Sequence, residues 1–312
     1  MIHDLNHAPH TDGYSFFGEQ ELSIISDPGV DDLIALSLIN KITGPGVNKQ
    51  LISTYGNAPG EVTAINAQAF TEFAGDGWSH RSGAAAPYHG EFELGWQYDF
   101  HGKDGVWGER PPHKESNIPP QPTSDPESAI SLAALTETYR LVGSGALKRL
   151  VVMGGVFDQP GNVNPYAECN IAQDPDAASL LFEKAGEVAT SIVPLDVTRQ
   201  VSWTFDDIQG IPTDTEENIW LKSLLTSWYA NFLPGKEKLF KLHDPLAAYL
   251  AFYPEAAHWL RHGVAVITEG EQRGRTVLSS ENQACDIAMG VEHPKDIAME
   301  IYRILFGHAD GS

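Results

Sequence analysis

The feature that most constrains the fold is a repeated alternation of short β-favouring runs and helical patterns. Residues 22–26 form such a run, which ends at Asp27-Pro28-Gly29, and apolar residues then recur at helical spacing from Val30 to Ile42. Further strands are expected at 50–55, 149–153 and 188–195, and further helices at 61–74 and 175–185. Continuously apolar strands that alternate with helices predict an α/β fold, a mainly parallel sheet with helices on both faces. Ligands of such sheets bind beyond the carboxyl ends of the strands.

The rest of the chain is expected to complete a single domain over residues 1–312, with residues 1–20 as a polar leader. Residues 83–126 form a long Gly-, Pro-, His- and Trp-rich stretch with little periodicity, which in a compact domain is usually functional or disordered. An aromatic helix is predicted at 216–232, and residues 264–305 predict one or two edge strands and a closing helix.

The charge balance excludes several function classes. The formal net charge is −22, and the sequence has no basic run that would attract phosphate backbones or anionic lipids, so neither nucleic acid nor a membrane is expected as a partner. No apolar segment is long enough to span a bilayer. The two cysteines, Cys169 and Cys285, cannot build a disulfide framework, which favours a reducing, cytoplasmic location.

Three carboxylates gather in the loop after the first predicted strand. Asp27, Asp31 and Asp32 lie within six residues at a predicted helix start. One such Asp is explained by helix capping and by the helix dipole. Three repel one another unless they share a cation, and clustered oxygen ligands select Ca²⁺ or Mg²⁺. The sequence therefore indicates a cation site whose other ligands come from elsewhere.

A second Asp-Pro helix start occurs late in the chain, at His243-Asp244-Pro245. Alone, it is the common start signal of an N-cap Asp followed by Pro. Together with the first acidic cluster, Asp244 would complete the cation site and His243 would place a titrating imidazole beside it. His243 as a purely structural histidine remains the alternative.

Motifs in one collinear order, from about Leu22 to the C-terminus, resemble the nucleoside hydrolases, the inosine-uridine-preferring nucleoside N-ribohydrolases. Each motif is weak by itself, whereas their common order is specific. They are Asp27-Pro28-Gly29-Val30-Asp31-Asp32, Gly56-Asn57, His101-Gly102-Lys103-Asp104-Gly105, Met153-Gly154-Gly155, Gly161-Asn162-Val163, Ala167-Glu168-Cys169-Asn170, Asp174-Pro175, Leu195-Asp196-Val197-Thr198 and His243-Asp244-Pro245. The resemblance implies a Rossmann-like domain that holds one Ca²⁺ at the bottom of a nucleoside pocket.

The resemblance also implies roles for individual residues. Asp27, Asp32 and Asp244 would bind Ca²⁺, Asp27 would also act as the base toward the attacking water, and His243 would help to protonate the leaving base. Ribose hydroxyls would be held by Asp31 with Asn57 close by, and by Asn162, Glu168 and Asn170. From the residues alone, these last three also fit a polar loop that satisfies its own backbone.

Two departures from the family pattern weaken the assignment of activity. Ile25 stands where the family usually has another Asp, two residues before Asp27. The central strand and the following Gly-Pro-Leu-Thr-Asn turn, whose threonine carbonyl helps to coordinate Ca²⁺, are not recognisable between Pro126 and Arg149, a stretch interpreted as shortened. Residues 129–138 favour a plain helix there, although Thr136 fits a compressed remnant of the turn.

The expected function is calcium-dependent hydrolysis of the N-glycosidic bond of ribonucleosides to ribose and free base. Two alternatives stay open: a related protein that binds a ribosyl ligand or metal with little turnover, or hydrolysis of a different N-ribosyl substrate. Tyr229 and Phe232 of the aromatic helix either stack on the base or belong to the core. The sequence fixes neither the preferred base nor the oligomeric state, for which a dimer or tetramer is one option.

Overall fold

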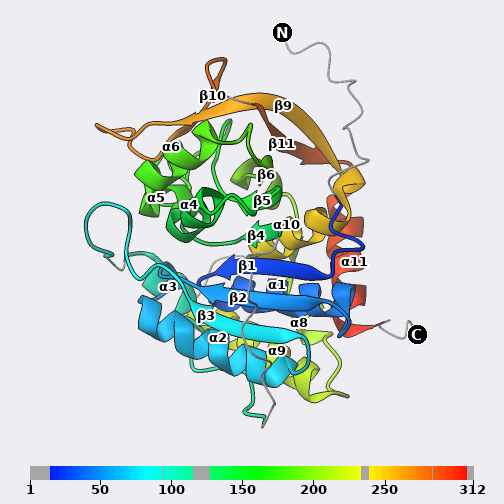
Figure 1. The fold of residues 1–312 in the computed structure, drawn as a ribbon. Coiled ribbons are helices and arrows are strands. Elements are labelled where there is room, and N and C mark those ends of the chain that lie inside the picture. Colours follow the sequence, from blue (N-terminus) through cyan, green and yellow to red (C-terminus); the bar gives the residue numbers. More distant parts are fainter. Residues whose placement is uncertain (1–14, 94, 115–126, 233–238, 283, 308–312) are drawn as a thin grey trace.

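The computed structural model describes residues 15–93, 95–114, 127–232, 239–282 and 284–307. The strands in this part of the chain form a nine-stranded sheet with the order β10-β9-β11-β6-β5-β4-β1-β2-β3, from the orange and brown strands to the cyan edge in Figure 1. Its strands are β1 (Glu21–Ser26), β2 (Asn48–Ser53), β3 (Trp78–Ser82), β4 (Ser128–Ser131), β5 (Arg149–Met153), β6 (Ala189–Val193), β9 (Ala257–Val266), β10 (Thr276–Ser279) and β11 (Ala284–Val291).

The first six strands are parallel and give the sheet its Rossmann-like character. Their order, 3-2-1-4-5-6, reverses between β1 and β4, which pair in parallel. In a doubly wound sheet this reversal opens a crevice at the carboxyl ends of the strands. Strand β11 continues the parallel set beside β6, while β9 and β10 run antiparallel at the far edge.

Helices cover both faces of this sheet. Neighbouring strand residues go to opposite sides, so Ile24 joins one apolar core and Ile25 the other. The first core includes α1 (Val30–Thr43), α2 (Gly60–Ala74), α9 (Glu216–Asn231), α10 (His243–Phe252) and α11 (Pro294–Phe306), and the second includes α4 (Thr136–Gly143) and α6 (Pro175–Glu183). The shorter elements are α3 (Gln97–His101), α5 (Cys169–Gln173), α7 (Leu195–Thr198), α8 (Phe205–Gln209), the 3₁₀ turn Pro254–Ala256 and the ribbon of β7 (Ser202–Trp203) and β8 (Phe240–Lys241).

The predicted alternation of strands and helices is confirmed, with boundaries shifted by one or two residues. The C-terminal region was underestimated, because β9, β10 and β11 are three strands where one or two were expected, and the first begins at Ala257. Residues 1–14 of the expected leader lie outside the described residues. Its end is part of the core, since the Phe16 side chain is buried.

The central strand that the sequence leaves unrecognised between residues 126 and 149 is present. Strand β4 occupies the centre of the sheet between β1 and β5. It is only four residues long and contains two serines, so its sequence carries little strand signal. The predicted helix over 129–138 is wrong for its first part, because α4 begins at Thr136. Since the strand is present, the floor of the sheet is complete at the site.

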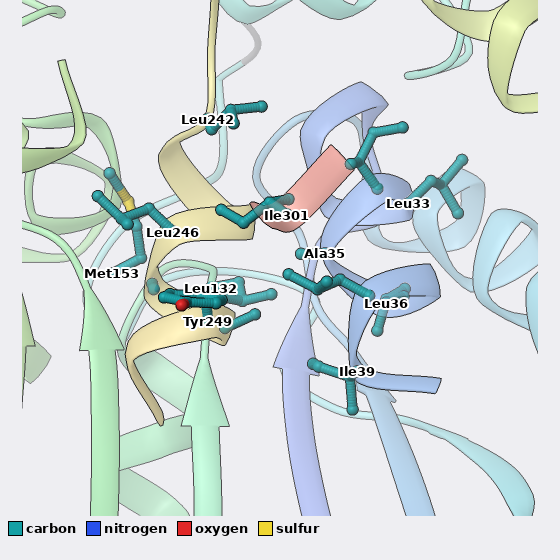
Figure 2. Packing of buried hydrophobic residues seen from close by; sticks show 14 of the residues in the cluster. Leu33, Ala35, Leu36, Ile39, Leu132, Met153, Leu242, Leu246, Tyr249 and Ile301 are labelled. Atoms are coloured by element: carbon teal, nitrogen blue, oxygen red, sulfur yellow. The ribbon is translucent and has the colours of Figure 1, made fainter. Parts of the chain in front are cut away.

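Packing of α1 against α10 determines where the acidic residues lie. Figure 2 shows the two helices side by side, with Leu33 and Leu36 of α1 and Leu246 of α10 buried among apolar neighbours above the strand ends. α10 is apolar on all sides apart from its first turn, as expected for a helix enclosed by other elements. This packing brings the N-terminal turns of α1 and α10, with their carboxylates, to the same edge of the sheet.

Substituting Leu246→Ala tests how much this packing stabilises the fold. The side chain is fully buried, so its truncation leaves a cavity and should lower the free energy of unfolding by about 2–5 kcal/mol. Urea denaturation followed by circular dichroism measures the change. The matched control is Leu278→Ala in edge strand β10, where the side chain is 47% exposed and the change should stay within about 0.5 kcal/mol. Equal effects at both positions would contradict the proposed packing.

Candidate functional site

A cavity of about 270 Å³ lies at the carboxyl ends of the parallel strands, at the point where the strand order reverses. This volume is close to the lower end of the ~300–1,000 Å³ typical of small-molecule sites. Seven of the nine predicted site residues line it: Asp31, Asn57, Asn162, Glu168, Asn170, His243 and Asp244. The other two, Asp27 and Asp32, are buried at the start of α1. The structure thus brings residues from distant parts of the chain to one site.

Asp32 has both carboxylate oxygens engaged by the protein. Its Oδ1 accepts a hydrogen bond from the Ser26 hydroxyl at 2.7 Å. Its Oδ2 accepts hydrogen bonds from the Gly29 N–H at 3.0 Å and the Asn57 side-chain amide at 2.7 Å. Asp32 is the third residue of α1, so its contact with Gly29 also caps the helix. These contacts fix the orientation of the carboxylate before any ligand binds.

Asp27 is held from one side only. Its Oδ2 accepts a hydrogen bond from the Asn57 N–H at 2.6 Å, whereas its buried Oδ1 has no hydrogen-bond partner. Gly56 makes the close approach possible, because a Cβ at this position would lie 1.9 Å from the same Oδ2. The Gly56-Asn57 turn after β2 therefore positions Asp27 and leaves one carboxylate oxygen available.

The structure combines Asp31, Asp32 and Asp244 into a cluster suited to a cation. One carboxylate oxygen of each lies within 4.8 Å of the others, and all three residues are buried. Asp27 is not part of this cluster, but its carboxyl lies against that of Asp32. Asp31 Oδ1, like Asp27 Oδ1, is buried without a hydrogen-bond partner. Free oxygens within an all-oxygen donor set fit a hard divalent cation such as Ca²⁺ or Mg²⁺.

Burial raises the pKa of every carboxyl in this group. For Asp27 and Asp244 the pKa lies well above its ordinary value, because burial disfavours the charged form and neighbouring carboxylates repel it. The pKa of Asp31 rises to about 8 for the same reasons, with Asp32 as the repelling neighbour. Burial also raises the pKa of Asp32, although hydrogen bonds from Ser26 and Gly29 oppose the rise. Without a cation, the protein alone does not favour full ionisation of this group near neutral pH.

Glu168, Asn170 and Asn162 also line the cavity. Glu168 is the N-cap of α5, where its carboxylate accepts hydrogen bonds from the N–H groups of Gly155, Asn170 and Ile171. Burial still raises its pKa to about 7. The Asn170 amide donates to the carbonyls of Leu132 and Met153 at the ends of β4 and β5. Glu168 therefore bonds N–H groups of its own loop and Asn170 bonds carbonyls of the two strand ends, and both residues also line the cavity.

Two imidazoles also line the cavity. His243 is held through its Nδ1, which lies 2.7 Å from the Thr198 hydroxyl, and burial together with Arg199 and Lys241 lowers its pKa to about 3. His101 accepts the Val30 N–H at its Nδ1, which leaves its Nε2 protonated 4.0 Å from Asp31 Oδ1. Burial, followed by the neighbouring His243, lowers the His101 pKa to about 3. Both rings are thus neutral in the free protein, and His101 is a site residue to which sequence reasoning gave no role.

An aromatic wall completes the cavity. Trp96 and Phe100, from the irregular 83–126 segment, line it together with Phe232. Phe232 stacks on Trp228 at 5.3 Å and meets Phe100 at 4.8 Å. Tyr229 instead packs on Phe205 and against the apolar core, and it is not one of the residues that line the cavity. The long aromatic-rich segment was the sequence feature that pointed to Trp96 and Phe100. Leu132 and Met153 also line the cavity, but as apolar residues at the ends of buried strands they could not be distinguished from core residues.

Comparison with known proteins identifies the family. The model of the inosine-uridine preferring nucleoside hydrolase family matches residues 24–298. The chain belongs to this family. It is 29% identical over 282 residues to a probable uridine nucleosidase 2 of Arabidopsis thaliana, covering 83% of this chain and 85% of the relative. It is 30% identical over 278 residues to a non-specific ribonucleoside hydrolase RihC of Shigella boydii, covering 81% and 86%.

Solved structures share the fold. A plant nucleoside hydrolase superposes with a TM-score of 0.82 at 22% identity, covering 93% of this chain and 99% of the other. A purine-preferring ribonucleoside hydrolase from Gardnerella vaginalis gives a TM-score of 0.80 at 24% identity, covering 93% and 98%. Family membership makes this chain a glycosidic-bond hydrolase. None of the helices in the described ranges is long and apolar enough to cross a membrane.

Substituting Gly56→Ala tests the positioning of Asp27. The new methyl group would meet the Asp27 carboxylate, so the Asp27 side chain must move and hydrolase activity should fall at least ~100-fold. Steady-state rates and the thermal midpoint are measured together. The control Gly290→Ala has open space around the added Cβ and should keep its activity. Full activity of Gly56→Ala would show that Asp27 does not need this position.

The raised carboxyl pKa values predict an inverse dependence of stability on pH in the presence of a chelator. Between about pH 6.5 and pH 8 the folded state holds protons on Asp31 and Glu168 that the unfolded chain has released, so the free energy of unfolding falls as pH rises. Below about pH 6.5 the lowered pKa values of His101 and His243 oppose this trend. A divalent cation competes with the carboxyl protons and should raise the thermal midpoint more at pH 8 than at pH 5. Calorimetry with EDTA or CaCl₂ checks this, and Asp31→Asn should flatten the pH dependence. A cation effect that is equal at both pH values would contradict it.

Proposed function

We propose that this protein hydrolyses the N-glycosidic bond of ribonucleosides to ribose and free base, and that it does so with Ca²⁺. The observation that carries the proposal is the convergence of the two acidic helix starts, at Asp31-Asp32 and at Asp244, on one cavity that also contains Asn162, Glu168 and Asn170. The names of the relatives, which include uridine nucleosidases and non-specific ribonucleoside hydrolases, support this substrate class.

Asp27, Asp32 and Asp244 are proposed as the cation ligands, with Asp31 close enough to share the site. The observation that supports this set is the pair of free buried oxygens on Asp27 and Asp31 beside the clustered carboxylates. When bound, a divalent cation would lower the pKa of a water molecule and so supply a nucleophile near neutral pH. It would also offset the mutual repulsion that raises the carboxyl pKa values.

The protein's own groups act on the sugar and on the proton. Asp27 accepts the proton of the attacking water through its free Oδ1, while the Asn57 N–H holds the other oxygen. Cleavage of the bond to the anomeric carbon develops positive charge on the ribose ring, and the buried carboxylates around the cavity stabilise it. Asp31, Asn162, Glu168 and Asn170 bind the ribose hydroxyls, with Asn57 adjacent to Asp31. Because polar groups left unpaired are costly, such a wall disfavours deoxyribose.

His243 is proposed to act on the leaving base as a hydrogen-bond donor. Its lowered pKa makes an imidazolium unfavourable in the free protein. In the tautomer whose Nδ1 accepts a hydrogen bond from the Thr198 hydroxyl, the neutral ring carries its proton on Nε2, where it can be donated to a base nitrogen. Phe100, Phe232 and Trp96 offer apolar surface to either a purine or a pyrimidine.

Substituting Asp27→Asn tests the proposal directly. The amide keeps the shape of the side chain but cannot take a proton, so release of reducing sugar from uridine and inosine should fall at least ~1,000-fold. Calcium affinity, measured by titration calorimetry, should weaken in the same variant. Exposed Asp76→Asn is the control and should retain both properties.

Chelation provides an independent test on the wild-type protein. Removing divalent cations with EGTA should abolish sugar release, and CaCl₂ should restore it. Sugar release that persists after complete chelation, or full activity of Asp27→Asn, would contradict the proposed mechanism. Binding of uridine without turnover at any calcium concentration would instead favour a ribosyl-binding protein.

A further inference from the structure

The loop that carries Asn162 is held by few side-chain contacts of its own. Its backbone closes on itself, since the N–H groups of Gly161 and Asn162 donate to the carbonyls of Pro165 and Ala167. Gly161 is required by close packing, because a Cβ there would lie 2.1 Å from the Ala167 carbonyl oxygen. Asn162 Oδ1 is buried without a hydrogen-bond partner beside the cavity. The loop thus presents a free acceptor, but its internal bonds do not tie it to the sheet.

Arg199 attaches the part of the loop next to Asn162 to α7. It follows α7 directly, and its guanidinium donates to the carbonyls of Pro160 at 2.6 Å and Gly161 at 3.2 Å and to the Gln159 side chain at 3.3 Å. Its own carbonyl accepts a hydrogen bond from Lys241 at 2.8 Å. The planar guanidinium presents its donors in a rigid fork, whereas a lysine ammonium is a single donor centre at the end of a flexible stem and fixes two carbonyls less rigidly. Arg199 therefore fixes the backbone immediately before Asn162 by hydrogen bonds.

The same short helix is tied to two other parts of the site. The Asp196 carboxylate accepts hydrogen bonds from the N–H groups of Phe157 and Asp158, at the start of the loop. Thr198 holds the His243 ring. Residues Asp196 to Arg199 consequently connect the ribose side of the cavity, through Asn162, with its leaving-group side, through His243.

We propose that Arg199 is a positioning residue for ribose recognition: its guanidinium holds the 159–161 backbone so that the Asn162 side chain meets a ribose hydroxyl. The proposal rests on the proposed function of the cavity. It assigns to Arg199 an effect that passes through Asn162, since the Arg199 guanidinium donates its hydrogen bonds to the loop.

A purely electrostatic role for Arg199 makes a different prediction. A cation near an acidic site could act by charge alone, and Arg199 contributes to the low pKa of His243. In that case Arg199→Lys, which keeps the charge, would behave as the wild type. A positioning role requires the hydrogen bonds from one guanidinium to the two carbonyls. Arg199→Lys should therefore recover only part of the kcat/KM that is lost in Arg199→Met.

The experiment is a double-mutant cycle on uridine and its 2′-, 3′- and 5′-deoxy analogues with the calcium-loaded protein. Arg199→Met should lower kcat/KM for uridine about 10- to 100-fold, because a small displacement of a binding group is enough for such a loss. Asn162→Ala should lower the preference for uridine over one of the three deoxy analogues. Arg199→Met should lower the preference over that same analogue. The double variant should be within about twofold of Asn162→Ala alone, because the two residues act as one unit.

Controls separate this inference from folding and from the proposed function. Arg303→Met removes an exposed arginine of α11 and should leave kcat/KM unchanged. The thermal midpoints of all variants are compared, and Arg199→Lys serves if Arg199→Met does not fold. The inference would be overturned if the losses in kcat/KM of the two single variants multiply in the double variant. It would also be overturned if Arg199→Met leaves the preference over the deoxy analogues unchanged, or if Arg199→Lys is fully active. An inactive wild-type protein would contradict the proposed function instead. In that case the double-mutant cycle is measured on the affinity for uridine, by titration calorimetry.

Discussion

The site depends on the packing of α1 against α10, because this contact brings together groups that repel one another. Asp31 and Asp32 begin one helix and Asp244 the other, and all three are buried with oxygens within 4.8 Å. Each helix N-terminus favours negative charge, and apolar packing behind the helix starts supplies the remaining free energy. The fold thus maintains an arrangement of carboxylates that is unfavourable in isolation and favourable around a cation.

Neighbouring carboxylates in this cluster differ in what remains free for a ligand. Asp32 accepts one hydrogen bond at Oδ1 and two at Oδ2, from Ser26, Gly29 and Asn57, and keeps a lone pair of Oδ1 for a cation. Asp27 and Asp31 each keep one oxygen without any hydrogen-bond partner. The same division occurs elsewhere in the cavity, where Glu168 is occupied by backbone N–H groups and Asn162 keeps its Oδ1 free. Asp32 and Glu168 are therefore held in fixed orientations by the protein, whereas Asp27, Asp31 and Asn162 have an oxygen with no protein partner.

Much of the fold and the acidic helix starts could be predicted from the sequence, because both depend on local signals. The proposed ribose-binding residues were expected only from the resemblance to the family: Asn57, Asn162, Glu168 and Asn170. The β1–α1 turn and the start of α10 each combine a strand or apolar helix with an Asp at a defined position. Strand β4 could not be predicted, because a sequence of four residues that includes two serines is compatible with a strand, a helix or a loop. These residues become a strand by pairing with β1 and β5 in the folded protein. His101 and Trp96 were missed as lining residues because their loop has no period from which to infer a direction.

Ile25, at the position where the resemblance to the family implies an Asp, is part of the apolar core. Ile25 is fully buried in the apolar core on the α4 and α6 face, where an ionised Asp would need a partner. Its hydrocarbon side chain leaves one fewer negative charge near Asp27, whose pKa is already raised by burial and repulsion. The orientation of Asp27 then depends on the Asn57 backbone N–H and on the absence of a side chain at Gly56. Because both are properties of the backbone turn after β2, the loss of an acid at position 25 leaves this support in place.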